Sequence, residues 1–248
     1  MAIDHSKNAI PVIDDRQSKE SCWSCGEMRA AHFCSACGKV QPPMPVDYFT
    51  FFGLPRKLRI DVAILETEFY QLSRNLHPDA YASKDKQEQE WSLEQSSQLN
   101  DAYRTLKDPI KRTQYLLKLE GVQLEEQSKS ATEEARTKGE MKKQVVPPAL
   151  LEEVFELNMQ LEEMRQSKKT GERDPELARE LQQQKVKLEG QLQHLFSELQ
   201  GYWSSWDRLI DRGTEEERRK VRDQMVDLLN RRNYIRNLVR DVGEILEV

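Results

Sequence analysis

Glycine, proline and aromatic residues are scarce in this chain of 248 residues. It holds only ten glycines and ten prolines, aromatic side chains make up 7% of it, and charged side chains make up 33%. Few turn-forming residues and many charged ones favour exposed amphipathic helices over a packed sheet. We therefore expect an all-α protein.

Three further absences exclude classes of function. No apolar run approaches the roughly 18–20 residues of a membrane-spanning helix, so we expect no membrane partner. The 43 Asp and Glu residues outnumber the 38 Lys and Arg residues, which argues against nucleic acid as a general partner, since that needs a basic surface. The chain also lacks a nucleophile elbow, a glycine-rich phosphate loop and a credible pair of catalytic carboxylates, so we expect no enzyme activity.

The N-terminal sequence does not have the features of a targeting segment. It has no apolar stretch of signal-peptide length, and it carries four acidic residues, Asp4, Asp14, Asp15 and Glu20. Transit peptides are rich in arginine and poor in acid. We interpret residues 1–21 as a disordered tail.

All four cysteines fall within sixteen positions. The pattern Cys-x-x-Cys-Gly occurs twice, and its cysteines are Cys22, Cys25, Cys34 and Cys37. Two residues between thiolates let both sulfurs face one ion, and two such pairs supply the four ligands of a closed structural Zn²⁺ site. The alternatives are two disulfides or redox-active pairs. An intracellular chain without a βαβ pattern around the cysteines favours a zinc module over residues 22–41.

A proline-rich spacer follows this module. Pro42, Pro43 and Pro45 predict a stiff, extended segment, so we expect the module to fold separately from the helices. Cys22→Ser would then lose the metal and leave the helical part folded. We interpret His32, between the two cysteine pairs, as a surface residue rather than a ligand.

Helical periodicity begins after the spacer. Asp61 is a suitable N-cap, and the apolar positions after it are Val62, Leu65, Phe69, Leu72 and Leu76. Those steps of three and four predict one face of a helix that Pro78 ends. A second helix is predicted over 86–106. A third is capped by Asp108, starts at Pro109 and stops near Gly121.

These residues resemble a known family. The runs that carry the resemblance are Asp47-Tyr48-Phe49, His77-Pro78-Asp79 and the stretch 99–109, which together are similar to a J domain over residues 46–121. Within that class, Arg112 and the stretch 115–121 resemble HscB, the iron–sulfur co-chaperone. Paired Cys-x-x-Cys motifs ahead of the J domain also occur in some HscB-like proteins.

The resemblance implies a role for the tripeptide. In J domains His77, Pro78 and Asp79 would contact an HscA/DnaK-type ATPase chaperone and stimulate ATP hydrolysis there. The helix before the tripeptide usually carries a basic face. Here it holds Asp61, Glu66 and Glu68 against Arg74 alone, so we expect weaker electrostatic steering toward an acidic partner.

The rest of the chain predicts a linker and a helix bundle. Residues 122–146 are almost all charged or small, which predicts a charged linker. Residues 147–248 predict an antiparallel three-helix bundle, with a long second helix over 175–210. Thr214 and Glu217 form a capping box that starts the last helix.

HscB-like proteins use this bundle to hold an IscU-like scaffold protein. The resemblance implies five scaffold-binding residues: Leu150, Leu151, Phe155, Glu156 and Tyr234. Leu157 and Leu161 are predicted core residues on the same helix. The implied compartment is the cytoplasm of a bacterium or the mitochondrial matrix of a eukaryote. The alternative function is a zinc-stabilised helical adaptor or a nucleic-acid-associated interaction protein.

Overall fold

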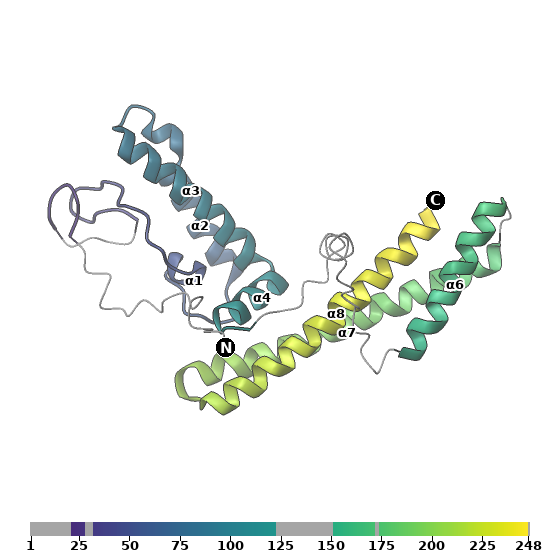
Figure 1. Cartoon of the computed structure of the whole chain (residues 1–248). Coiled ribbons are helices and arrows are strands. Elements are labelled where there is room, and N and C mark those ends of the chain that lie inside the picture. Colours follow the sequence, from purple (N-terminus) through teal and green to yellow (C-terminus); the bar gives the residue numbers. More distant parts are fainter. Residues whose placement is uncertain (1–20, 28–31, 123–150, 172–173, 248) are drawn as a thin grey trace, which may run out of the picture. The chain divides into compact units, whose positions relative to one another are not determined.

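The computed structural model describes residues 21–27, 32–122, 151–171 and 174–247, and it divides the chain into two compact units, Met1–Gln123 and Leu124–Val248 (Figure 1). Among the described residues all the regular elements are helices, and the β-structure is limited to one isolated antiparallel bridge between Phe33 and Val40. The all-α prediction is therefore confirmed. No helix in this part of the chain has both the length and the apolar character that crossing a bilayer requires.

The first unit is built around a helical hairpin. Its elements are α1 (Tyr48–Phe51), α2 (Val62–Leu76), the 3₁₀ turn η1 (Pro78–Tyr81), α3 (Lys86–Lys107) and α4 (Pro109–Leu119). Each α-helix starts at an aspartate whose carboxylate accepts backbone N–H groups, at Asp47, Asp61, Asp85 and Asp108. These caps satisfy donors that the first helical turn leaves free. The predicted caps at Asp61 and Asp108 are confirmed.

The predicted apolar faces of α2 and α3 meet in the core of this unit. Leu65 and Leu76 of α2 and Leu99, Ala102 and Leu106 of α3 are each at most 2% exposed. Burying a leucine of this kind contributes about 1.5–3 kcal/mol relative to leaving it exposed. The sequence periodicity had thus placed Leu65 and Leu76 correctly on the buried face of α2.

The cysteine module belongs to this core, which corrects the expectation that it folds separately. Val40 is fully buried in one hydrophobic cluster with Phe51, Leu76 and Leu99, and Phe33 packs against that cluster. The prolines after residue 41 do extend the chain, but they come after Val40 has already docked. A proline spacer keeps two segments independent only if neither segment buries an apolar side chain against the other.

The described residues of the second unit form three helices: α6 (Leu151–Thr170), α7 (Pro175–Arg212) and α8 (Glu215–Glu247). Lys187 lies 2.7 Å from Glu153, and the Gln160 amide donates to Glu180 at 3.1 Å. Later residues of α6 thus meet earlier residues of α7, so the two helices are antiparallel as predicted. The predicted capping box is also confirmed, since the Thr214 N–H donates to Glu217 at 2.8 Å.

The bundle has three helices at one end and two at the other. Figure 1 shows α6 beside one end of the long α7–α8 hairpin. The two-helix end has its own buried apolar side chains, namely Leu199, Trp203, Trp206, Val221 and Met225. Residues 123–150, which include most of the predicted linker and Leu150, lie outside the described residues.

Candidate functional site

The four cysteine sulfurs form a cluster. All four Sγ atoms lie within 4.8 Å of one another. The shortest approaches cross between the two pairs, at 3.7 Å from Cys22 to Cys37 and 3.6 Å from Cys25 to Cys34. Those distances are well beyond a disulfide bond of about 2.05 Å. Four free thiols around one point are the donor set of a closed tetrahedral metal site.

Local backbone geometry explains why each pair turns its sulfurs to the same side. The N–H groups of Gly26 and Gly38 donate to the carbonyls of Cys22 and Cys34, each at 2.9 Å. Both glycines have positive φ, 76° and 70°, which a residue with a Cβ adopts at a cost. The glycine after each pair therefore closes the turn that presents both thiols.

Backbone donors favour the thiolate form at the two buried cysteines. Burial raises the pKa of Cys22, but N–H groups of Cys25 and Ser24 together with the Gln41 amide lower it to about 6. The N–H of Cys37 lowers the pKa of Cys34. At Cys25 the Glu27 N–H lowers the pKa, but burial and the neighbouring cysteine side chains raise it to about 12. Metal ligands must be deprotonated, so the backbone donors favour that form at the two buried cysteines and not at Cys25.

His32 is not a free surface residue, which corrects that expectation. It is half-buried; its Nδ1 lies 2.9 Å from the Gln95 side-chain oxygen and its Nε2 lies 3.0 Å from the Phe51 carbonyl. The Gln95 amide donates to the Gln41 carbonyl at 2.7 Å. These bonds fasten the cysteine module to α1 and α3.

An aromatic contact fastens the other side of the module. The rings of Trp23 and Trp91 meet edge to face with centroids 5.5 Å apart. The Lys39 ammonium lies 4.5 Å from the Trp23 ring centroid and 3.8 Å from the Glu88 carboxylate. We did not predict this contact from the sequence. Polar residues at buried positions of α3, such as Gln95, were the signal in the sequence that could have revealed that the cysteine module docks on this helix.

The tripeptide His77-Pro78-Asp79 lies at the turn between α2 and α3. The side chains of His77 and Asp79 are 58% and 92% exposed. The Asp79 N–H donates to His77 Nδ1 at 3.3 Å, and the Asp79 carboxylate lies 3.6 Å from the same nitrogen. The turn therefore presents an imidazole and a carboxylate to solvent, as the sequence predicts for an exposed loop.

The helix before the turn is poor in positive charge at the surface. The Glu66 carboxylate accepts from the Tyr103 hydroxyl at 2.8 Å and from Lys107 at 3.2 Å. Glu68 and Arg74 are both exposed. The face of α2 beside the turn thus has no basic stripe, in line with the expectation of weak electrostatic steering.

One exposed apolar stripe lies on α6. Phe155 and Met159, one turn apart, are 67% and 60% exposed, whereas Leu157 and Leu161 are 4% and 2% exposed. The prediction that Leu157 and Leu161 are core residues is confirmed. Glu156 is exposed beside Phe155. The side chains of Leu150 and Leu151 lie outside the described residues.

Tyr234 does not share this exposure. It is 5% exposed, and burial, with the nearby charge of Asp241, raises the pKa of its phenol. The sequence pattern assigned it to a binding surface because an aromatic residue stood at the matching position. In this structure its ring faces the interior of the bundle, so it adds no exposed surface to the α6 stripe.

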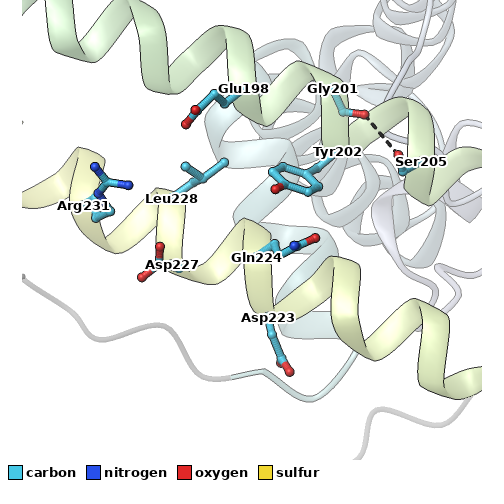
Figure 2. Close-up of a pocket in the computed structure, with 9 residues that line it drawn as sticks. All are labelled: Glu198, Gly201, Tyr202, Ser205, Asp223, Gln224, Asp227, Leu228 and Arg231. Atoms are coloured by element: carbon cyan, nitrogen blue, oxygen red, sulfur yellow. Dashed lines mark hydrogen bonds between the residues drawn. The ribbon is translucent and has the colours of Figure 1, made fainter.

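A cleft of about 740 Å³ lies between α7 and α8 and is drawn in Figure 2. Three carboxylates, of Glu198, Asp223 and Asp227, line it together with Arg231. Its serine, Ser205, donates to the Gly201 carbonyl of its own helix at 3.4 Å (Figure 2). The lining contains no histidine, cysteine or lysine, so it offers no activated nucleophile.

Comparison with known proteins agrees with this arrangement. A family model described as the DnaJ domain matches residues 47–115, which include the exposed tripeptide and exclude the cysteines. The human iron–sulfur cluster co-chaperone protein HscB is 36% identical over 148 residues, 57% of each chain. A co-chaperone protein HscB homolog of Vibrio cholerae is 31% identical over 156 residues, which cover 63% of this chain and 79% of that protein. The chain belongs to the HscB family.

Coverage differs among the HscB relatives. The match spans 53% of the Arabidopsis thaliana homolog and 47% of the Mus musculus protein, about half the length of each. Two solved HscB structures share the fold. The human crystal structure has a TM-score of 0.57 at 23% identity and covers 90% of this chain and 97% of its own. The Vibrio cholerae structure has a TM-score of 0.53 at 24% identity and covers 82% and 98%.

Proposed function

We propose that this protein is a co-chaperone that brings an IscU-like iron–sulfur cluster scaffold to an HscA/DnaK-type ATPase chaperone and stimulates that ATPase. One observation carries the proposal: a chain of the HscB family presents His77-Pro78-Asp79 on an exposed turn between two packed helices. The turn supplies contacts and no chemistry of its own. ATP is hydrolysed in the site of the partner.

Recognition of the ATPase rests mainly on this turn. Charge steering accelerates association when opposite fields face each other, but α2 beside the turn exposes both Glu68 and Arg74. The imidazole of His77 and the carboxylate of Asp79 are the groups left to make directed contacts. We therefore expect stimulation to depend strongly on these two side chains and weakly on salt.

His77→Gln tests the proposal. Glutamine cannot reproduce the planar imidazole that His77 exposes on this turn, so we expect at least a tenfold loss of stimulation in a single-turnover ATPase assay with a DnaK-type chaperone. Circular dichroism should show an unchanged fold, because the side chain is 58% exposed. His194→Gln is the matched control, since His194 is 76% exposed on α7. Normal stimulation by His77→Gln would show that the tripeptide is an ordinary turn with no role in stimulating the ATPase.

The scaffold contact is assigned to the exposed stripe of α6. Phe155 and Met159 present apolar surface to solvent, with Glu156 beside them, and Leu150 and Leu151 are predicted to extend this stripe toward the N-terminus. Isolated apolar residues are common on surfaces, but adjacent large ones on one helix face mark contact sites. Val154, Leu157 and Leu161 face the bundle instead.

Phe155→Ala tests the scaffold contact. Truncating an interface anchor typically costs ~2 kcal/mol or more, so we expect at least a tenfold rise in the dissociation constant for an IscU-like scaffold by calorimetry. Thermal stability should change little, because an exposed ring leaves no cavity in the free bundle. Leu161→Ala, at a position 2% exposed, should do the reverse. If both variants melt early and bind normally, the stripe is not the contact.

The cysteine cluster is proposed to hold one structural Zn²⁺ through Cys22, Cys25, Cys34 and Cys37. The donor set supports the ion, since four thiols converge within 4.8 Å and the pKa of Cys22 is lowered to about 6. Four cysteine ligands leave no open position for catalysis. Metal analysis of reduced protein should find about one Zn²⁺ per chain, and its absence would reject the assignment.

The alternative function is a zinc-stabilised helical adaptor or a nucleic-acid-associated interaction protein. It predicts a salt-dependent mobility shift with DNA or RNA and no effect on a DnaK-type ATPase. The two assays together separate the functions.

A further inference from the structure

The flanks of the His77-Pro78-Asp79 turn are held by polar side chains of α3. Three of them, Gln89, Ser92 and Ser96, follow each other at steps of three and four, which places them on one face of the helix. Polar side chains in the interior of a helix usually face solvent or bond to their own helix four residues earlier. These three bond instead to the segment that carries the tripeptide.

Two hydroxyls hold the entry to the turn. Ser92 and Ser96 both donate to the Leu76 carbonyl, at 2.8 Å and 2.6 Å. Leu76 is the last residue of α2, and its carbonyl has no partner within its own helix. Ser92 is fully buried, so its hydroxyl replaces the water that would otherwise satisfy this helix end. The residue directly before His77 is thereby fixed from two directions.

The exit from the turn is held in the same way. The Gln89 amide donates to the carbonyls of Ala82 and Lys84, at 3.3 Å and 2.9 Å. Tyr81, whose ring is buried in the core cluster, donates its hydroxyl to the Asn75 carbonyl at 3.0 Å. This last bond ties the end of the 3₁₀ turn back to the end of α2.

The exposed tripeptide makes few contacts that could set its direction. Its bonds stay within the turn: the Ala80 N–H donates to the His77 carbonyl at 2.9 Å, the Ala82 N–H donates to the Asp79 carbonyl at 3.4 Å and the Asp79 N–H donates to His77 Nδ1 at 3.3 Å. The Asp79 carboxylate also lies 3.6 Å from His77 Nδ1. We propose that Ser92, Ser96 and Gln89 are positioning residues that hold the tripeptide in the geometry in which the ATPase partner binds it. This inference rests on the proposed co-chaperone function.

The double variant Ser92→Ala with Ser96→Ala removes both donors to the Leu76 carbonyl. We expect amide hydrogen exchange at Asp79 and Ala80 to accelerate about tenfold. The concentration of protein that gives half-maximal ATPase stimulation should rise about tenfold, equivalent to about 1.4 kcal/mol, with little change in the maximal rate. Ser92→Ala with Ser96→Thr keeps one hydroxyl and should recover most of the affinity.

The matched control is Ser197→Ala with Ser205→Ala on α7. Both of those hydroxyls bond to carbonyls of their own helix, Gln193 at 3.1 Å and Gly201 at 3.4 Å, so the control should match the wild type in both assays. The proposal is overturned if exchange at Asp79 accelerates no more than exchange at Leu99 and Ala102 on α3, or if the threonine variant recovers nothing. A different outcome separates the two proposals. If the double variant exchanges faster at Asp79 but the wild-type protein stimulates no DnaK-type ATPase, the proposed function is overturned, while the bonds that hold the loop remain supported.

Discussion

Removing the proposed Zn²⁺ should destabilise the J-domain helices as well as the cysteine module. The perturbation is a strong chelator under reducing conditions, or Cys22→Ser. Without a cation the two cysteine pairs lose the cross-link that sets the turn around them. The residues that follow, as far as Gln41, then lose the constraint that docks them on α1 and α3.

The expected loss of stability follows from the contacts that break when the cysteine module leaves α1 and α3. Val40 is fully buried against Phe51, Leu76 and Leu99, and exposing it costs about 1.5–3 kcal/mol. Gln95, 2% exposed, loses its bonds to His32 and Gln41, and each bond contributes about 0.5–1.5 kcal/mol net. We expect the free energy of unfolding of the first unit to fall by roughly 3 kcal/mol. For a unit of this size that is a drop in melting temperature of roughly 10–20 °C.

Hydrogen exchange on the intact chain is the measurement. Amides of α3 near Gln95 and Leu99 should exchange faster after metal removal, while amides of α7 near Leu181, in the second unit, should be unaffected. Val40→Ala in metal-loaded protein is the companion variant and should reproduce part of the loss. Unchanged exchange in α3 after complete metal removal would refute the reasoning and restore the picture of an independent module.

Two further predictions concern stability. Burial raises the pKa of Asp47, but hydrogen bonds from Arg56 and Thr50 lower it more, so it lies below the ordinary 3.8. Its contribution is therefore present above about pH 4 and is lost as pH falls through the lowered pKa. Asp47→Asn, which keeps a good N-cap, should destabilise by about 1 kcal/mol at pH 7, and this deficit should shrink as pH falls through the lowered pKa. A deficit in urea titrations that does not change with pH would contradict this. Leu181→Ala, at a fully buried position, should cost about 2–5 kcal/mol, whereas Val186→Ala, 59% exposed, should melt like the wild type.

The helices and their ends follow from local rules. Asp61, Asp108 and the Thr214–Glu217 box sit at helix starts because side-chain oxygens satisfy N–H groups that any first turn leaves free, whatever surrounds it. The spacing of Leu65, Leu76 and Leu99 likewise identifies buried faces, because a helix that packs must turn one stripe inward. Such signals lie within a few residues of one another and need no knowledge of distant partners.

The binding surface on the bundle was only partly predictable. Phe155 and Tyr234 both matched the pattern of a scaffold contact, yet Phe155 is 67% exposed and Tyr234 is 5% exposed. Periodicity places a residue on a face of its helix, but whether that face meets solvent depends on where the neighbouring helices end. The exposure of each residue could be assigned only once the packing of α6, α7 and α8 against one another was known.

The sequence alone determined that the protein is helical, that four cysteines can share one ion, and that His77-Pro78-Asp79 lies on a turn, because each of these depends on residue types at short spacings. Only the tertiary structure decided that Val40, His32 and Gln95 join the cysteine module to the hairpin, and that Ser92 and Ser96 bond to the end of α2. The reason is physical: these contacts join residues up to 63 positions apart. A polar residue at a buried helical position reveals its partner only when the segment that carries the partner has been brought beside it.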